Sequence, residues 1–209
     1  AAPTRGPGRL IVGSMRHPGR RREALREDIR GWFSERGYLI EDLSQRACVA
    51  ELTGPMVLDR GRGVGLCGIS ERVDEAGLAA MHDAFGLRLC FACDLQPGEY
   101  HANVVLSVLA GRACVLCPAS FSDPAVPDAI EALYPGRCLR ISEDEKNAFA
   151  ANCIALTDRD LFLSAVAHDA LAPEKRRRLR EWGFELHAVE LDEIEKAGGS
   201  LRCMVAEIF

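Results

Sequence analysis

The chain alternates short apolar runs with amphipathic segments and glycine stops, and this order repeats. Residues 56–59 and 64–70 are apolar runs around a glycine-rich turn, which predicts a strand hairpin. Residues 73–85 carry apolar side chains at helical spacing, and Gly86 is placed to end that helix. Residues 87–95 are again strand-like. The segment therefore predicts a unit of strand, strand, helix and strand.

The same order occurs twice more, at a period of about 50 residues, which indicates a symmetric array. The second unit has strands at 103–110, 113–121 and 137–142 with a helix at 127–134. The third has strands at 152–157, 161–168 and 184–191 with a helix at 173–182. A partial copy comes earlier, with strands at 9–15 and 38–44 around a helix at 21–36, and its first strand would lie upstream of Ala1. We predict an α/β ring in which loops of different units converge on a central axis.

Length and composition fit one globular domain over residues 1–209, with residues 1–8 as a loose lead-in. The chain has 48% hydrophobic and 27% charged residues and a net charge of −5. This balance gives no general attraction to nucleic acid or to anionic membranes. No apolar run approaches the ~20 residues of a membrane span, and the first residues lack the apolar core of a secretory signal.

Nine cysteines raise the question of disulfides or a metal site. Most of them lie in apolar, strand-like runs and their number is odd, so we predict free thiols and a cytoplasmic location. The pairs Cys90/Cys93 and Cys114/Cys117 have CxxC spacing, and a four-cysteine zinc site is the alternative. In a strand, residues three apart point to opposite faces, so we expect no metal and no other cofactor.

Three segments at element boundaries hold the candidate chemistry: residues 50–55, 98–105 and 195–204. In the last, the pair Gly198 and Gly199 permits a close backbone approach, and Arg202 would favour a thiolate at Cys203. We interpret Cys203 as the nucleophile because its setting is polar and rich in glycine. The alternative is one more buried thiol among nine.

His101 and Glu51 complete this candidate site. Each lies just before a predicted hairpin, at equivalent places of consecutive units. A cysteine and a histidine distant in sequence but close in space are the usual layout for nucleophilic cysteine catalysis. Taken alone, His101 reads as a surface or satisfied core histidine, and Glu51 as a solvated turn residue. The basic runs at 20–22 and 176–178 are interpreted as solvated helix faces.

Together these segments resemble the guanidine-modifying, pentein-type enzymes, which include arginine deiminases, dimethylarginine dimethylaminohydrolases and amidinotransferases. The stretch 196–204 resembles the nucleophile motif and 100–108 the histidine motif. Residues 50–74 resemble the acidic segment with its G-x-S-x-R signature, which ends here at Arg72, and 148–156 resembles a further stretch before the last unit. The resemblance runs from about Arg9 to Phe209.

The resemblance implies a propeller of five ββαβ units, of which about four are present and the first is missing. It also implies that Cys203 is the nucleophile, His101 the acid and base, and Glu51 the residue that orients substrate and histidine. Arg72 aligns with a residue that meets the substrate carboxylate in some relatives. Asn103 and Gly199 are expected at the substrate.

One departure concerns the substrate. Arginine deiminases carry an aspartate two residues after the histidine, where this chain has Asn103. A neutral amide binds a guanidinium less strongly than a carboxylate does. Free arginine is therefore the less favoured substrate within this family.

We expect a hydrolase that cleaves a C–N bond of a small guanidino substrate through a covalent intermediate on Cys203. An amidinotransferase with an amine acceptor is the alternative within the enzyme class. A catalytically silent pentein that serves as a binding module is the alternative from another class. The oligomeric state stays open, with a homodimer as one alternative.

Overall fold

The computed structural model describes residues 8–206, and the predicted lead-in up to Pro7 lies outside the described residues. The first complete unit matches the predicted order. Its strand β4 pairs antiparallel with β3 and parallel with β5, so β4 is the middle strand. The elements are β3 (Met56–Asp59), β4 (Val64–Ile69), α3 (Glu75–Phe85) and β5 (Leu89–Asp94).

The next two units repeat this pairing, with an antiparallel first strand and a parallel third strand around the middle one. The second unit comprises α4 (Ala102–Val105), β6 (Leu106–Leu109), β7 (Ala113–Leu116), α5 (Ala125–Glu131) and β8 (Cys138–Arg140). The third comprises β9 (Ile154–Ala155), β10 (Asp160–Ser164), α7 (Ala165–Ala170), α8 (Pro173–Glu181) and β11 (Glu185–Val189). The predicted α/β class is confirmed.

The N-terminal unit has two parallel strands, β1 (Arg9–Val12) and β2 (Leu39–Asp42). The single helix predicted over 21–36 is wrong, because two helices, α1 (Pro18–Ala24) and α2 (Glu27–Ser34), occupy this stretch. The guanidinium of Arg30 explains the break. It donates to the Ala24 carbonyl at 2.7 and 2.9 Å and to the Asp42 carboxylate at 2.6 Å, so α2 folds back over the end of α1.

The strand predicted over 103–110 is also wrong in its first half, where α4 forms one buried helical turn. The Asn103 side chain donates to the Thr53 carbonyl at 3.0 Å, and its backbone N–H donates to the Gly54 carbonyl at 3.1 Å. These bonds tie the chain to the previous unit before it enters β6. A short apolar run has no period that separates helix from strand, so tertiary contacts decide its conformation.

Four further short α-helices within the described residues were not predicted: α6 (Glu143–Asn147), α7, α9 (Asp192–Glu195) and α10 (Leu201–Met204). The strand predicted over 161–168 is therefore wrong in its second half, where α7 begins directly after β10. Helix α6 begins with a reciprocal pair, because the Ser142 hydroxyl accepts from the Glu145 N–H while the Glu145 carboxylate accepts from the Ser142 N–H. Helix α10 carries Cys203, for which a polar loop was predicted.

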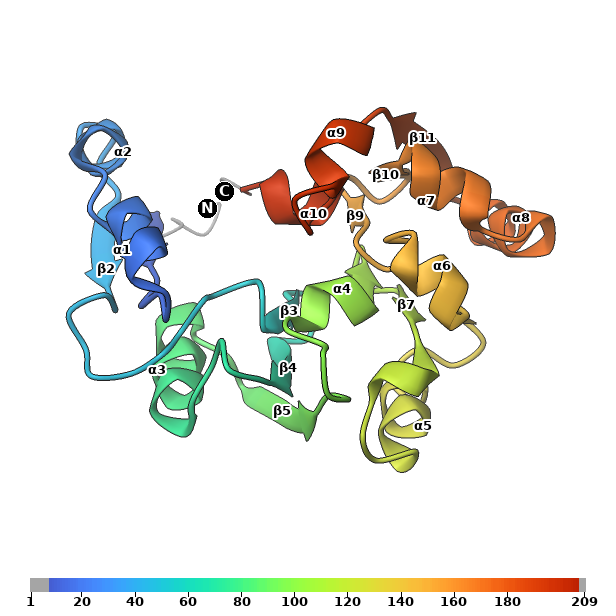
Figure 1. Ribbon diagram of the computed structural model, residues 1–209, viewed down its shortest axis with the longest axis horizontal. Coiled ribbons are helices and arrows are strands. Elements are labelled where there is room, and N and C mark those ends of the chain that lie inside the picture. The colour runs from blue at the N-terminus through green and yellow to red at the C-terminus, as the bar shows by residue number, and fades with distance from the viewer. Residues whose placement is uncertain (1–7, 207–209) are drawn as a thin grey trace, which may run out of the picture.

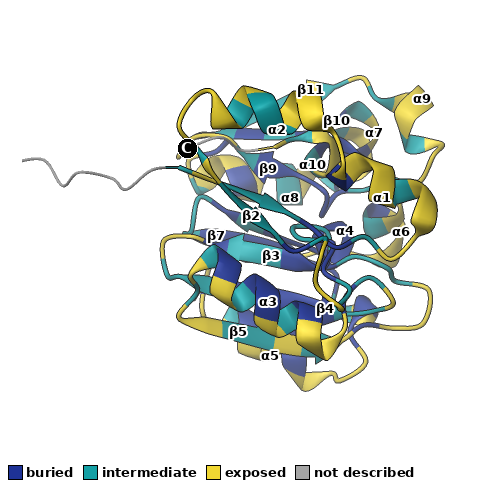
Figure 2. Cartoon of the chain, turned by 90° about the vertical axis from the view of Figure 1, so that its left-hand side faces the viewer, coloured by how far each residue is buried: buried dark blue, intermediate teal, exposed yellow. Residues whose placement is uncertain are grey.

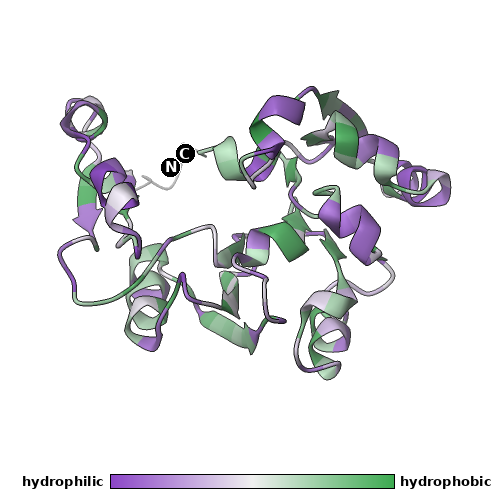
Figure 3. Ribbon diagram, viewed as in Figure 1, coloured by the Kyte–Doolittle hydropathy of each residue, from purple (hydrophilic) through white to green (hydrophobic). Residues whose placement is uncertain are grey.

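The four sheets follow one another along an arc in Figure 1, from β1 and β2 at one end to the β9–β11 sheet at the other. The first strands of neighbouring units touch, β3 against β6 and β6 against β9. Figure 2 shows buried residues in the middle strand β4 and in α4, with intermediate and exposed residues on the outer strand β5 and exposed residues on outer helices such as α2. Figure 3 shows the same division as hydropathy, since α6 and α8 are largely purple while the strands are mostly green. The first strands thus line the inside of the arc.

An arginine in the hairpin turn of each of two units binds the next unit. Arg62 donates to the carbonyl oxygens of Gly111 at 2.5 Å and Leu133 at 3.1 Å. Its guanidinium carbon also lies 4.8 Å from the centre of the Tyr134 ring. The turn of one unit therefore holds both the turn and the helix end of the following unit.

Arg112 repeats this contact one unit later. It donates to the Trp182 carbonyl at 2.6 Å and to the Asp158 carbonyl, and it lies 4.1 Å from the Phe184 ring centre. Arg159 occupies the equivalent turn of the last unit, where it is exposed. Because the same contact recurs, the two pairs of neighbouring units pack against each other in the same way.

Within residues 8–206, the helices lack the length and apolar character needed to cross a bilayer.

Candidate active site

Glu51 lies in the loop before β3, and its side chain is fully shielded from solvent. Arg20 on α1 donates to Oε2 at 2.5 Å, and the Arg16 backbone N–H donates to Oε1 at 3.2 Å. Arg72 Nη1 lies 3.4 Å from both carboxylate oxygens. The loop before β3 therefore carries a buried carboxylate that is held by two arginines.

The ionisation of Glu51 follows from these partners. Burial by itself raises the pKa of the carboxyl, because an apolar environment disfavours the charge. The hydrogen bond with His101, the charges of Arg20 and Arg72 and the Arg16 N–H act in the opposite direction, and together they lower the pKa to about 2. Glu51 is therefore an anion at neutral pH.

His101 stands at the start of α4 and faces this carboxylate, with Nε2 at 3.4 Å from Glu51 Oε2. Its ring packs on Gly54, where a Cβ would lie 2.7 Å from Nε2. Any side chain at this position would displace the ring, so Gly54 is required for the close approach. The neighbouring Tyr100 ring lies 4.9 Å away, and its hydroxyl donates to the Gly198 carbonyl. This bond connects the histidine segment to the C-terminal segment.

Cys203 lies on α10 and is exposed. Its sulfur accepts a hydrogen bond from Asn152 Nδ2 at 3.3 Å and lies 3.8 Å from Asn103 Oδ1. Gly199 packs against it, since a Cβ there would lie 3.6 Å from the Cys203 Cβ. The thiol therefore has one amide donor and one amide acceptor on the protein side, with its remaining surface open.

The structure thus places the predicted residues in two connected groups. Glu51, His101 and Arg72 form one group, while Cys203, Asn103 and Gly199 form the other. Two links join them: the step from His101 to Asn103 within α4, and the bond between Tyr100 and Gly198.

The other thiols differ from Cys203 in exposure. All nine cysteines fall within residues 8–206 and are unpaired there. Burial raises the pKa of Cys67 and Cys153 to about 12 and that of Cys93 to about 11. These groups are therefore protonated at neutral pH and poorly accessible to reagents.

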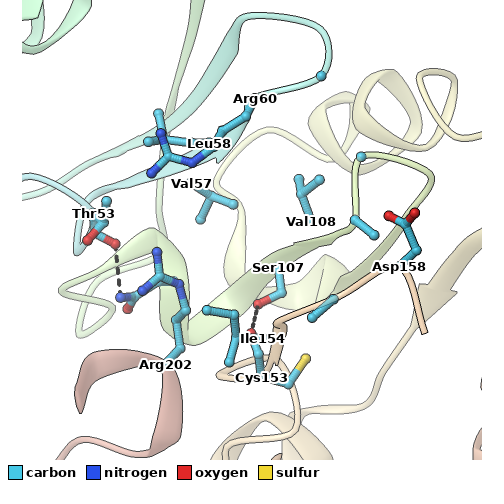
Figure 4. A pocket seen from close by; sticks show the side chains of 15 residues that line it. Thr53, Val57, Leu58, Arg60, Ser107, Val108, Cys153, Ile154, Asp158 and Arg202 are labelled. Carbon is cyan, nitrogen blue, oxygen red and sulfur yellow. Dashed lines mark hydrogen bonds between the residues drawn. The ribbon is translucent and has the colours of Figure 1, made fainter. Parts of the chain in front are cut away.

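A cavity of about 260 Å³ lies behind this site, between β3, β6 and β9. Figure 4 shows Thr53 and Arg202 on one side of it and Asp158 near the hairpin turns, with Ser107 bonded to the Cys153 carbonyl at 2.8 Å. Asn103 lines this cavity, whereas Glu51, His101 and Cys203 do not. The cavity is consequently separate from the reactive side chains.

One group with metal-ligand chemistry occurs within the described part of the chain, and it lies on the last sheet. Asp160, Glu185 and His187 bring ligand atoms within 4.8 Å of one another, and His187 Nε2 is 2.8 Å from Asp160 Oδ1. The two CxxC pairs do not belong to this group, so the absence of a metal at those pairs stays a prediction.

Comparison with protein families matches residues 2–209 to the family described as N,N dimethylarginine dimethylhydrolase, eukaryotic. The chain belongs to this dimethylarginine dimethylhydrolase family. The match covers nearly the whole chain, and the resemblance to guanidine-modifying enzymes of the pentein type is confirmed.

A curated relative of the family is the N(G),N(G)-dimethylarginine dimethylaminohydrolase of Mycobacterium tuberculosis. It is 29% identical over 198 residues, which are 95% of this chain and 61% of the relative. The chain therefore spans about three fifths of the length of this dimethylarginine dimethylaminohydrolase.

Solved structures show the same fold at lower identity. The N-terminal domain of ArgZ, a cyanobacterial arginine dihydrolase, gives a TM-score of 0.79 at 20% identity, over 94% of this chain and 69% of that domain. A dimethylarginine dimethylaminohydrolase carrying an adduct of 4-chloro-2-hydroxymethylpyridine gives 0.69 at 21% identity, over 93% and 71%. The dimethylarginine dimethylhydrolase family and these structures therefore share one architecture.

Sequence reasoning missed two residues that contact the candidate site residues in the structure. Arg20, in a run interpreted as a solvated helix face, instead binds the buried carboxylate of Glu51. Asn152 is fully buried and contacts Cys203. Asn152 carried a usable signal, because it is a polar side chain within the apolar stretch 148–156. Arg20 carried none, since an arginine run on a helix is common on protein surfaces.

Proposed function

We propose that this chain is a hydrolase of guanidino compounds, with Cys203 as nucleophile, His101 as acid and base, and Glu51 as the group that orients His101. The observation that carries the proposal is the placement of the Cys203 sulfur. It is held between two buried amides, on the segment that Tyr100 ties to the hydrogen-bonded pair of His101 and Glu51. Family membership supports the same chemistry.

The reaction proceeds in two steps. The Cys203 thiolate attacks the guanidinium carbon, and protonated His101 gives its proton to the departing amine, so that an amidino thioether forms and one C–N bond breaks. His101 then removes a proton from water as the water attacks the same carbon. The thiolate leaves, and the product carries a ureido group.

Glu51 supports both steps through charge. An anionic carboxylate 3.4 Å from His101 stabilises the imidazolium that donates the proton in the first step. Its oxygens are also bound by Arg20 and Arg72, so a cationic substrate must compete with these two side chains. Arg72 and Asn103 remain our proposals for contacts to the substrate.

We further propose that the arc is an incomplete ring of five units. Within residues 8–206, the N-terminal sheet has two strands, whereas the other three sheets have three. The match covers about three fifths of the Mycobacterium relative, so the rest of that relative has no counterpart in the matched region. A small-molecule partner follows from the chemistry, while the cytoplasmic location and the homodimer stay predictions.

An assay for ureido product tests the proposal. The full chain is incubated separately with L-arginine, N,N-dimethylarginine and a simple alkylguanidine, and the product is compared with that of Cys203→Ser. We expect Cys203-dependent product from at least one of them. A new guanidino compound formed from an added amine, with no ureido product, would instead indicate an amidinotransferase. No product from any compound would contradict the hydrolase.

A further inference from the structure

We propose that the side-chain amide of Asn152 holds the Cys203 sulfur in its reactive thiolate form. The inference rests on the proposed function, because it assigns a role to a residue that contacts the proposed nucleophile. Asn152 is fully buried, and its Nδ2 lies 3.3 Å from Cys203 Sγ. A hydrogen bond to a charged acceptor is stronger than one to a neutral acceptor, so this donor favours the thiolate over the thiol.

The orientation of the Asn152 amide is fixed by its other partners. Its Oδ1 accepts from the Arg202 backbone N–H at 3.1 Å, which requires the oxygen to point toward α10. Its Nδ2 also donates to the Asn103 carbonyl at 2.8 Å. The two N–H bonds of Nδ2 are therefore shared between this carbonyl and the sulfur, and the amide cannot turn over without losing three contacts.

Asn103 presents the opposite group to the same sulfur. Its Nδ2 donates to the Thr53 carbonyl, so its Oδ1 faces Cys203 Sγ at 3.8 Å. That oxygen can accept from the thiol S–H but repels a thiolate. Asn152 is the nearer of the two and has the reverse preference. In the thiol form the S–H proton therefore points to Asn103. In the thiolate form the negative charge is stabilised by Asn152.

A purely structural role for Asn152 would be complete without the sulfur. The bonds to Arg202 and to Asn103 already connect α10 to α4. The contact with Cys203 is a third and separate bond, and it involves the reacting atom. Loss of the donor should therefore change the reactivity of the sulfur even where the fold is intact.

The test measures alkylation of Cys203 by iodoacetamide, followed on its own peptide by mass spectrometry at pH 7 and pH 10. Asn152→Leu keeps the approximate size of the side chain and removes the donor to the sulfur without adding a charge. We expect the alkylation rate of this variant at pH 7 to be roughly 10-fold lower than that of wild type. This is the lower end of the effect expected when a hydrogen bond to a charged group is lost. At pH 10 we expect an alkylation rate within about twofold of wild type, because the thiolate then forms without the hydrogen bond from Asn152.

Asn147→Leu is the matched control, since it makes the same chemical change at an exposed position of α6. It should leave both rates unchanged. Labelling of the buried Cys153 reports loss of the fold, and Asn152→Ser provides a second variant if the first unfolds. If both variants unfold, the rate at pH 7 is divided by the rate at pH 10 for the wild type, in the folded and in the urea-denatured state. This ratio should be higher in the folded protein.

Equal pH 7 rates in wild type and a folded Asn152 variant would overturn the inference, as would equal ratios in the folded and denatured chain. Alkylation requires no guanidino substrate. A chain that shows the Asn152 effect but forms no ureido product would therefore contradict the proposed function and leave the Asn152 inference standing.

Discussion

Glu51→Gln should remove part of the pH dependence of stability. The substitution keeps the size of the side chain but not its charge. In the folded chain the pKa of Glu51 is lowered from its ordinary value of 4.5 to about 2, because the bond with His101, the two arginines and the Arg16 N–H outweigh the effect of burial. A carboxyl with a lowered pKa stabilises the fold above its unfolded pKa and loses that contribution as pH falls through the folded pKa.

The difference between 4.5 and about 2 corresponds to about 3 kcal/mol of stability at neutral pH. About 2 kcal/mol of it should be lost between pH 6 and pH 3, with the rest lost below pH 3. The side chain is fully shielded from solvent, so salt should screen this contribution only weakly. The wild type should therefore lose about 2 kcal/mol more than Glu51→Gln over this range.

Urea unfolding at pH 6 and pH 3, followed by circular dichroism, measures this difference. Glu35→Gln, an exposed glutamate at the end of α2, is the matched control and should behave as wild type. At pH 6 we also expect Glu51→Gln to be less stable than wild type, because Arg20 and Arg72 lose their counter-charge. The same loss of stability between the two pH values in Glu51→Gln and in wild type would refute this reasoning.

Further outcomes follow from the same contacts. Arg112→Ala should lower the unfolding free energy by about 2 kcal/mol, because two hydrogen bonds and a ring contact are lost. Arg159→Ala, at the equivalent exposed turn, should change the unfolding free energy by less than about 0.5 kcal/mol. His101→Ala should lower turnover by roughly 10² to 10⁴-fold, with the fold checked by circular dichroism. Iodoacetamide at limiting dose should label Cys203 first, and uniform labelling of all nine cysteines would contradict the exposure pattern. Elemental analysis should find no stoichiometric zinc at the CxxC pairs.

The order of elements could be predicted from sequence wherever a glycine ends a helix and an apolar run follows it. Gly86 shows why, since its backbone adopts the left-handed conformation (φ +62°) that ends α3. The conformation of 102–105 could not be predicted, because so short a run of three apolar residues and Asn103 fits a strand and a buried helical turn equally well. Their contacts with Thr53 and Gly54 of the previous unit decide it.

The break between α1 and α2 could not be predicted from the sequence for a different reason. The side chain of Arg30 binds the Ala24 carbonyl and the Asp42 carboxylate across this break, and the helical spacing of 21–36 does not show these contacts. Among the candidate site residues, Glu51 and His101 were selected by position in the repeat together with the family resemblance, and the structure places them 3.4 Å apart. Arg20 and Asn152 were missed because their roles depend on the packing of other units against them.

Mass spectrometry of the Cys203 peptide after rapid acid quench tests the central claim most directly. The full chain is mixed with N,N-dimethylarginine or L-arginine, quenched in the millisecond-to-second range and digested, with Cys203→Ser as control. The covalent mechanism predicts an amidino group on Cys203 that appears before the ureido product and is absent from Cys203→Ser. Ureido product formed without this adduct, or formed equally by Cys203→Ser, would contradict it.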